Sequence, residues 1–213
     1  MILCMFHPVG HPMDRGWVGR VDGDRVVHLA AQTLQSFFTG GGTAREHAEY
    51  PLGEVVLLAP VLHPPSVRVF DDVHSCVFAN PAAIVGPGAS IAPPSDTVSQ
   101  GRLGVLVRPT AVVGADGEVG GFTILAEWRA AGIAPPKDRD FALGLGPVVV
   151  TPDQLTPTGF DWKAAVEFAA RGTVLYPGDL LAGPAVASHE IAAGGAARLE
   201  VEGIGVLEQR VAG

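Results

Sequence analysis

The sequence predicts a mixed β fold with few helices, of the α+β class. Gly contributes 28 and Pro 18 of the 213 residues, a composition that favours short strands joined by tight turns. Short apolar runs recur between turn signals, and the spacing of apolar residues suits a helix at 30–38 and again at 161–171. Because 47% of the residues are hydrophobic and 17% charged, the chain can bury one sizeable core.

The first 55 residues predict a small β-rich unit with one helix. The apolar start of the chain is too short for a signal peptide and lacks a basic segment, so it is interpreted as a first strand. Asp22-Gly23 supplies the positive φ angles that a tight hairpin turn requires. The helix expected at 30–38 ends at three glycines, 40–42, which favour a helix C-terminus.

A proline-rich extended segment at 51–65 predicts the boundary between this unit, residues 1–55, and a larger one, residues 56–213. Regularly spaced strands beyond it favour a curled or barrel-like mixed sheet. The helix at 161–171 has Asp161 as its expected cap. The remaining expected elements are strands at 67–70, 83–85, 103–107 and 121–126, and a closing pair within 198–211 that breaks at Gly203 and Gly205.

The charge balance excludes some classes of partner. The formal net charge is -8, the pI is near 5.2 and no basic run is present, so we expect no binding to nucleic acid. No apolar run approaches the roughly 20 residues of a membrane helix, and we expect no membrane association. Cys4 and Cys76 cannot form a disulfide framework, which favours a reducing, cytoplasmic location.

Six sequence blocks, taken in order, resemble the fumarylacetoacetate hydrolase family. The resemblance implies a β-roll core with a small N-terminal β-rich domain and a homodimer. It also implies action on small 2-oxo or 1,3-dioxo carboxylic acids with Mg²⁺ or Mn²⁺. The blocks are PLGEVVLLAPVLHPPSVR (51–68), FANPAAIVGPGASIAPP (78–94), GGFTILAEW (120–128), KDRDFALGLGPVVVTPDQL (137–155), LYPGDLLAG (175–183) and LEVEGIGVL (199–207).

The metal-binding pattern implied by this resemblance is degenerate. Relatives place two glutamates at alternate positions of one strand and an aspartate on a neighbouring strand. The blocks align these positions with Gln100, Arg102 and Glu127. An arginine beside a cation is unfavourable, because like charges about 4 Å apart repel by roughly 4 kcal/mol at an effective dielectric of 20. We therefore expect no divalent metal and no other cofactor at this site.

Two readings of the exchanged positions stay open. Gln100 and Arg102 are either ordinary exposed strand residues, or the Arg102 guanidinium takes the place of the cation. In the second case Arg102 would pair with Glu127 or hold a ligand carboxylate through its planar fork.

The resemblance also assigns a general base and a substrate-binding cation. His74, two residues after Asp72, resembles the family histidine that removes a proton, and an imidazole is suited to that role near neutral pH. Lys137, three residues before Asp140, resembles the lysine that contacts the substrate oxyanion. Either residue could instead be an ordinary loop residue. The candidates are thus His74 and Lys137 for catalysis, and Arg102, Glu127, Gln100 and Asp140 for substrate binding.

Two functions remain open at this point, and the sequence does not decide whether the chain is an enzyme. The first is a hydrolase of C–C bonds, a decarboxylase or a tautomerase that acts on a small 2-oxo acid without bound metal. The second is a catalytically silent homologue that binds a small carboxylate or serves as a structural partner subunit. The family's hydroxyl-bearing carboxylate grip corresponds to 183–185, which reads Gly-Pro-Ala, so substrate anchoring is weakened as well.

Overall fold

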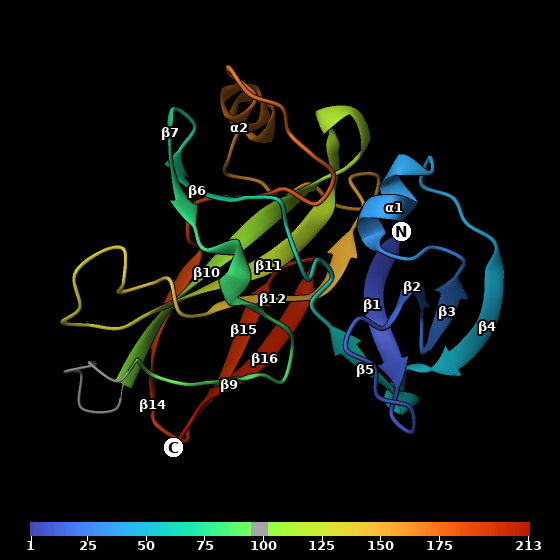
Figure 1. Cartoon of the computed structure of the whole chain (residues 1–213), viewed down its shortest axis with the longest axis horizontal. Helices are drawn as coiled ribbons and strands as arrows, with labels where there is room; N and C mark the ends of the chain where they lie inside the picture. The colour runs from blue at the N-terminus through green and yellow to red at the C-terminus, as the bar shows by residue number, and fades with distance from the viewer. Residues whose placement is uncertain (95–101) are drawn as a thin grey trace.

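A computed structural model describes residues 1–94 and 102–213 as two β-sheets with two short α-helices (Figure 1). The larger sheet has thirteen strands in these residues and the smaller has three. Most pairs are antiparallel, and three are parallel. The predicted mixed β fold with few helices is therefore confirmed.

The N-terminal elements follow the predicted order. β1 (Ile2–Pro8) pairs with β2 (Trp17–Asp22), β2 with β3 (Arg25–Leu29), and β3 with β4 (Glu46–Pro51). The β2–β3 hairpin is confirmed, but its turn is Gly23-Asp24 and not Asp22-Gly23, because Asp22 pairs with Arg25. Gly23 has the expected positive φ, at +64. Helix α1 (Leu34–Thr39) begins later than the predicted 30–38, because Thr33 caps it by accepting a hydrogen bond from the backbone of Ser36.

The centre of the larger sheet consists of three long antiparallel strands, β10 (Arg102–Val113), β11 (Val119–Arg129) and β12 (Leu143–Val150). On one side of these strands the order continues through β1 to β4, so the sheet runs through the position of the predicted boundary. Residues 1–55 and 56–213 as separate domains stay a prediction. The other members of the sheet are β5 (Val55–Leu58), β6 (Val67–Asp72), β7 (Ser75–Ala79), β8 (Ile84–Val85), β13 (Leu180–Ala182) and β14 (Ala187–Ala192).

The small sheet packs across the long strands and closes the core. It consists of β9 (Ser90–Ile91), β15 (Ala196–Val201) and β16 (Gly205–Val211), and Figure 1 shows β15 and β16 crossing β10 to β12. The indole N–H of Trp128 in β11 donates to Oε1 of Gln209 in β16 at 2.8 Å. The predicted break at Gly203 and Gly205 is confirmed, because both have positive φ.

Helix α2 (Trp162–Ala169) is capped by Asp161 as predicted, since the Asp161 carboxylate accepts the backbone N–H of Ala164 at 3.0 Å. No helix in the described part of the chain has the length and apolar character needed to cross a membrane. Short 3-10 turns are η1 (Leu52–Glu54), η2 (Pro81–Ala83) and η3 (Ala115–Gly117).

A proline marks the point where β10 changes partner. Residues 102–107 of β10 pair with β14, and residues 110–112 pair with β13. Pro109 lies between the two ladders, where its missing N–H breaks no strand pairing on that side. Its carbonyl accepts the N–H of Gly183, in the segment that joins β13 to β14. Two residues of β10, 108 and 109, therefore face the four residues 183–186, and Arg108 belongs to the candidate site.

Candidate functional site

Glu127 is the centre of a buried group of charges. It lies in β11 and is only 1% exposed. Its Oε2 accepts a hydrogen bond from Nε of Arg108 at 2.8 Å, and its Oε1 accepts one from Nη2 of Arg129 at 2.7 Å. Nη1 of Arg139 lies 3.6 Å from Oε1. We call these four residues, together with Asp71, the Glu127 cluster.

Arg108 is held by backbone as well as by carboxylates. Its Nη1 donates to Oδ1 of Asp71 and to the carbonyl of Gly183, each at 3.0 Å, and lies 3.3 Å from the carbonyl of Phe70. The Arg108 side chain is 2% exposed, whereas that of Asp71 is 83% exposed. The buried guanidinium of Arg108 is therefore paired with a carboxylate that is itself exposed to solvent.

The strand register places two residues of β10 beside Glu127. Leu106 lies directly opposite Glu127, and Arg108 is the next residue of β10 on the same face. An apolar side chain and a cation therefore lie beside this carboxylate.

The residues present do not fit a divalent cation. Mg²⁺ and Mn²⁺ prefer several carboxylate or carbonyl oxygens. Both Glu127 oxygens already accept hydrogen bonds from guanidinium groups, and Arg108 brings a fixed positive charge to the same place. No group of three or more His, Cys, Asp and Glu side chains suited to a metal exists within 1–94 and 102–213.

Of the readings left open for Arg102, a pair with Glu127 is not formed. Arg102 begins β10 and is well exposed, with its Nη1 3.5 Å from Oε2 of Glu190 on β14. Arg102 lies four residues along β10 from Leu106, the register partner of Glu127, which is beyond side-chain reach. The arginine of β10 that pairs with Glu127 is Arg108. Gln100 lies outside the described residues.

The other predicted residues lie in two places. His74 is exposed in the tight turn between β6 and β7, where its backbone N–H donates to Oδ1 of Asp72 at 2.7 Å. Lys137 and Asp140 form an ion pair of 2.8 Å in the loop between β11 and β12. The structure therefore brings Lys137 to Asp140 and leaves His74 at the far end of its hairpin.

A cavity of about 460 Å³ adjoins the Glu127 cluster. We call it the Asn80 cavity, and its polar lining comes from Asn80, Arg139 and Asp140. Nδ2 of Asn80 fixes the loop by donating to the carbonyl of Asp140 at 2.9 Å. Its apolar wall includes Val77, Phe78, Pro135 and Pro136.

Arg139 belongs both to this cavity and to the Glu127 cluster. A hydrogen bond to Asp138 is the main cause of a raised pKa at Arg139, so its positive charge is fixed. An apolar cavity with one guanidinium is chemically suited to a small carboxylate.

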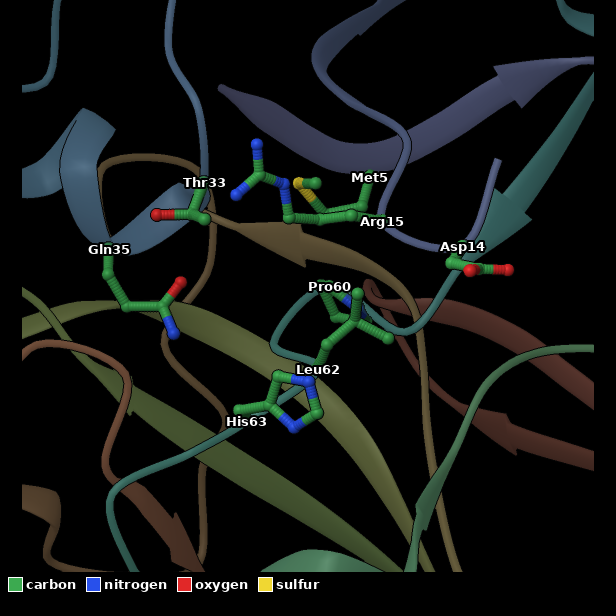
Figure 2. Close-up of a pocket in the computed structure, with 8 residues that line it drawn as sticks. All are labelled: Met5, Asp14, Arg15, Thr33, Gln35, Pro60, Leu62 and His63. Carbon is green, nitrogen blue, oxygen red and sulfur yellow. The ribbon is translucent and has the colours of Figure 1, made fainter. Parts of the chain in front are cut away.

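A smaller cavity of about 260 Å³ lies against β1 and contains none of the candidate residues (Figure 2). Met5, Arg15 and Gln35 line it from the N-terminal strands and α1, and Leu62 and His63 line it from the segment after β5. It therefore lies between residues of the two predicted domains and is separate from the Glu127 cluster.

Sequence reasoning found Glu127 but missed Arg108, Arg129, Arg139 and Asp71. A signal for Arg108 was available, because it is the only charged residue in the apolar run 103–113, and Glu127 is likewise isolated in the apolar run 121–128. Buried charges of this kind need partners. Two isolated charges of opposite sign in neighbouring strands could have been paired on that ground.

The comparisons with known proteins agree with this fold. No family model and no curated protein matches the chain. Solved structures do match over its full length. Maleylpyruvate hydrolase from Sphingobium sp. SYK-6 superposes with a TM-score of 0.80 at 18% identity, covering 100% of this chain and 99% of that one. The same hydrolase has been solved with manganese(II) and pyruvate.

Two further solved structures also match the fold of this chain. The 5-carboxymethyl-2-hydroxymuconate delta-isomerase from Mycobacterium smegmatis matches with a TM-score of 0.77 at 22% identity, covering 100% of this chain and 99% of that one. A 2-keto-3-deoxy-D-arabinonate dehydratase, solved with magnesium and 2,5-dioxopentanoate, matches with a TM-score of 0.80 at 15% identity and the same coverage. The chain therefore has the fold of the fumarylacetoacetate hydrolase family, as its sequence blocks predicted.

Proposed function

We propose that the chain binds a small 2-oxo carboxylic acid without a divalent cation, and that it has lost the cation-dependent chemistry of its structural neighbours. One observation carries this proposal. The guanidinium of Arg108 is hydrogen bonded to Glu127, the residue that the resemblance aligns with the family's metal-binding aspartate. In cation-dependent enzymes the metal polarises the oxo groups of the substrate, and a guanidinium already hydrogen bonded to Glu127, Asp71 and Gly183 does not replace that function.

The Asn80 cavity is the proposed ligand site. Arg139 supplies a charged donor for a carboxylate, and Asn80 supplies an amide next to it. The prolines and Phe78 supply an apolar wall for a short carbon chain. Within residues 1–94 and 102–213, the ion-pair partners of Arg139 are Asp138 and the shared Glu127, so an incoming carboxylate competes with few of these contacts.

A tautomerase of 2-oxo acids is the second candidate. Lys137 is bonded to Asp140, and Asp140 lines the Asn80 cavity, so an ammonium is available at its edge. Tautomerisation requires proton transfer next to a carbonyl and can proceed without a metal. His74, the predicted base, lies in the β6–β7 turn and does not line the cavity, which is why carboxylate binding alone is preferred.

One set of measurements tests both candidates. Pyruvate is titrated into the chelator-treated protein, and binding is followed by ligand-observed NMR. Binding that is unchanged by added Mg²⁺ and lost in Arg139→Gln supports the proposal, and Arg102→Gln, which alters a remote exposed arginine, should bind as wild type does. Exchange of the pyruvate methyl protons in D₂O would identify the tautomerase. Turnover of an acylpyruvate that requires Mg²⁺ would refute metal independence.

A further inference from the structure

A cavity beneath α2 is lined by two arginines and by no carboxylate. It measures about 300 Å³ and shares Phe78 with the Asn80 cavity. Its charged lining consists of Arg68 from β6 and Arg171 after α2, and its other polar lining includes Cys76 and Thr173. We call it the Arg68 cavity. It contains no residue of the Glu127 cluster.

Arg68 is a buried cation whose charge has no partner in the described residues. It is 6% exposed, and its Nη1 donates to the carbonyl of Ala169. Its Nε has no hydrogen-bond partner within the described ranges, and no carboxylate there lies within ion-pair distance. The Phe78 ring, with its centroid 5.4 Å from Cζ, covers the guanidinium. Because an unpaired buried charge is costly, this arrangement points to an anion supplied from outside.

Arg171 places a second cation at the same cavity. Its Cζ lies 5.4 Å from the centroid of Phe168, so each arginine rests on a phenylalanine ring. No ion pair to Arg171 occurs in the part of the chain that the structure describes. Burial raises the pKa of Cys76 and the Arg68 charge only partly opposes this, so the thiol is neutral near pH 7 and supplies no counter-charge.

We propose that the Arg68 cavity binds a small doubly charged oxyanion of the phosphate class, held by the guanidinium groups of Arg68 and Arg171. Two positive charges without counter-charges call for two negative ones. Both arginines line the cavity, and a guanidinium can donate to two oxygens of one anion. The Thr173 hydroxyl can donate a further hydrogen bond. The net charge of -8 does not favour anions in general, so binding would depend on these local contacts.

The direct test is a calorimetric titration with inorganic phosphate. Methyl phosphate is run alongside to distinguish the free ion from an ester, and acetate at equal ionic strength provides a singly charged comparison. We expect saturable binding of phosphate or its ester and none of acetate. Arg171→Gln should weaken binding about tenfold or more through loss of a charge-assisted hydrogen bond, whereas the matched variant Arg198→Gln should not change it. Both arginines are exposed, so both variants should fold.

Alkylation of Cys76 gives a second readout that is specific to the cavity. Cys4 is fully buried, so a maleimide should modify Cys76 first, and bound phosphate should slow that reaction in wild type but not in Arg171→Gln. Three results would overturn the proposal. They are absence of saturable phosphate binding, acetate binding as tight as phosphate binding, and an alkylation rate that phosphate does not alter.

Discussion

Nε of Arg108 lies 2.8 Å from Oε2 of Glu127, and the two side chains are 2% and 1% exposed. This buried pair joins two neighbouring strands, β10 and β11. A buried ion pair is strongly destabilising only when it is broken, because one charge is then left without its partner. The pair therefore fixes the local structure around Glu127.

Breaking the pair from one side should destabilise the fold. We expect Arg108→Met or Glu127→Leu to lower the free energy of unfolding by about 3 kcal/mol each, measured by urea denaturation. The double variant should lose less than the sum of the two, because it leaves neither partner of this pair buried. Additive losses would show that the two residues are not coupled.

Restoring carboxylates at the positions given by the register should create a cation site. In Leu106→Glu with Arg108→Glu, three carboxylates would face one another across β10 and β11. We expect this variant, but not the wild type, to bind Mn²⁺ in a titration followed by electron paramagnetic resonance. The control is Leu106→Gln with Arg108→Gln, which removes the arginine without adding charge. Equal Mn²⁺ binding by the control or the wild type would contradict the assignment.

Gly144 should be required for the contact between the two sheets. A Cβ at this position would lie 2.2 Å from Oε1 of Gln209, the atom that accepts the Trp128 indole N–H. We expect Gly144→Ala to lower the free energy of unfolding by about 1–3 kcal/mol through overpacking. Gly104→Ala is the matched control, since its nearest neighbour would be 3.8 Å away. Similar losses for the two variants, compared by thermal unfolding, would rule out this steric cause.

The stacked histidines should make the N-terminal strands sensitive to acid. The His28 and His47 ring centroids are 5.1 Å apart, and His28 also stacks on Trp17 at 4.7 Å. Burial, followed by the charge of His47, lowers the pKa of His28 below its usual value.

As the pH falls below about 6.5, His28 should therefore bind a proton in the unfolded state before it does so in the folded state. The free energy of unfolding should decline over this range, until the pH reaches the lowered pKa of His28 in the folded state. We expect His28→Gln to reduce this decline, measured as the melting temperature between pH 7.5 and 5. His189→Gln, at an exposed position, is the control. An unchanged slope in His28→Gln would exclude His28 as the cause.

Much of the fold could be predicted from local pattern. The β2–β3 hairpin, the Asp161 cap of α2 and the break at Gly203 and Gly205 each depend on residues that are close in the sequence. The site could be predicted only in part. Glu127 was identified, but the sequence left open whether Arg102 pairs with it, and the β10 arginine that does so is Arg108.

The site could be predicted only in part because side chains alternate between the two faces of a strand. Alternation fixes which face a residue occupies, and a shift of six positions, from 102 to 108, keeps the face while it moves the residue about 20 Å along the strand. Only pairing with β11 selects the residue that meets Glu127.

The sequence by itself thus determined the class of fold, the β2–β3 hairpin and the Asp161 cap of α2. Those features depend on propensity, turn chemistry and residue type, all of which act over a few neighbouring residues. The tertiary structure decided which arginine pairs with Glu127, that Lys137 pairs with Asp140, and that Arg68 is buried with no carboxylate partner among the described residues. Those relationships arise from strand register and from packing between distant segments, which local pattern does not specify.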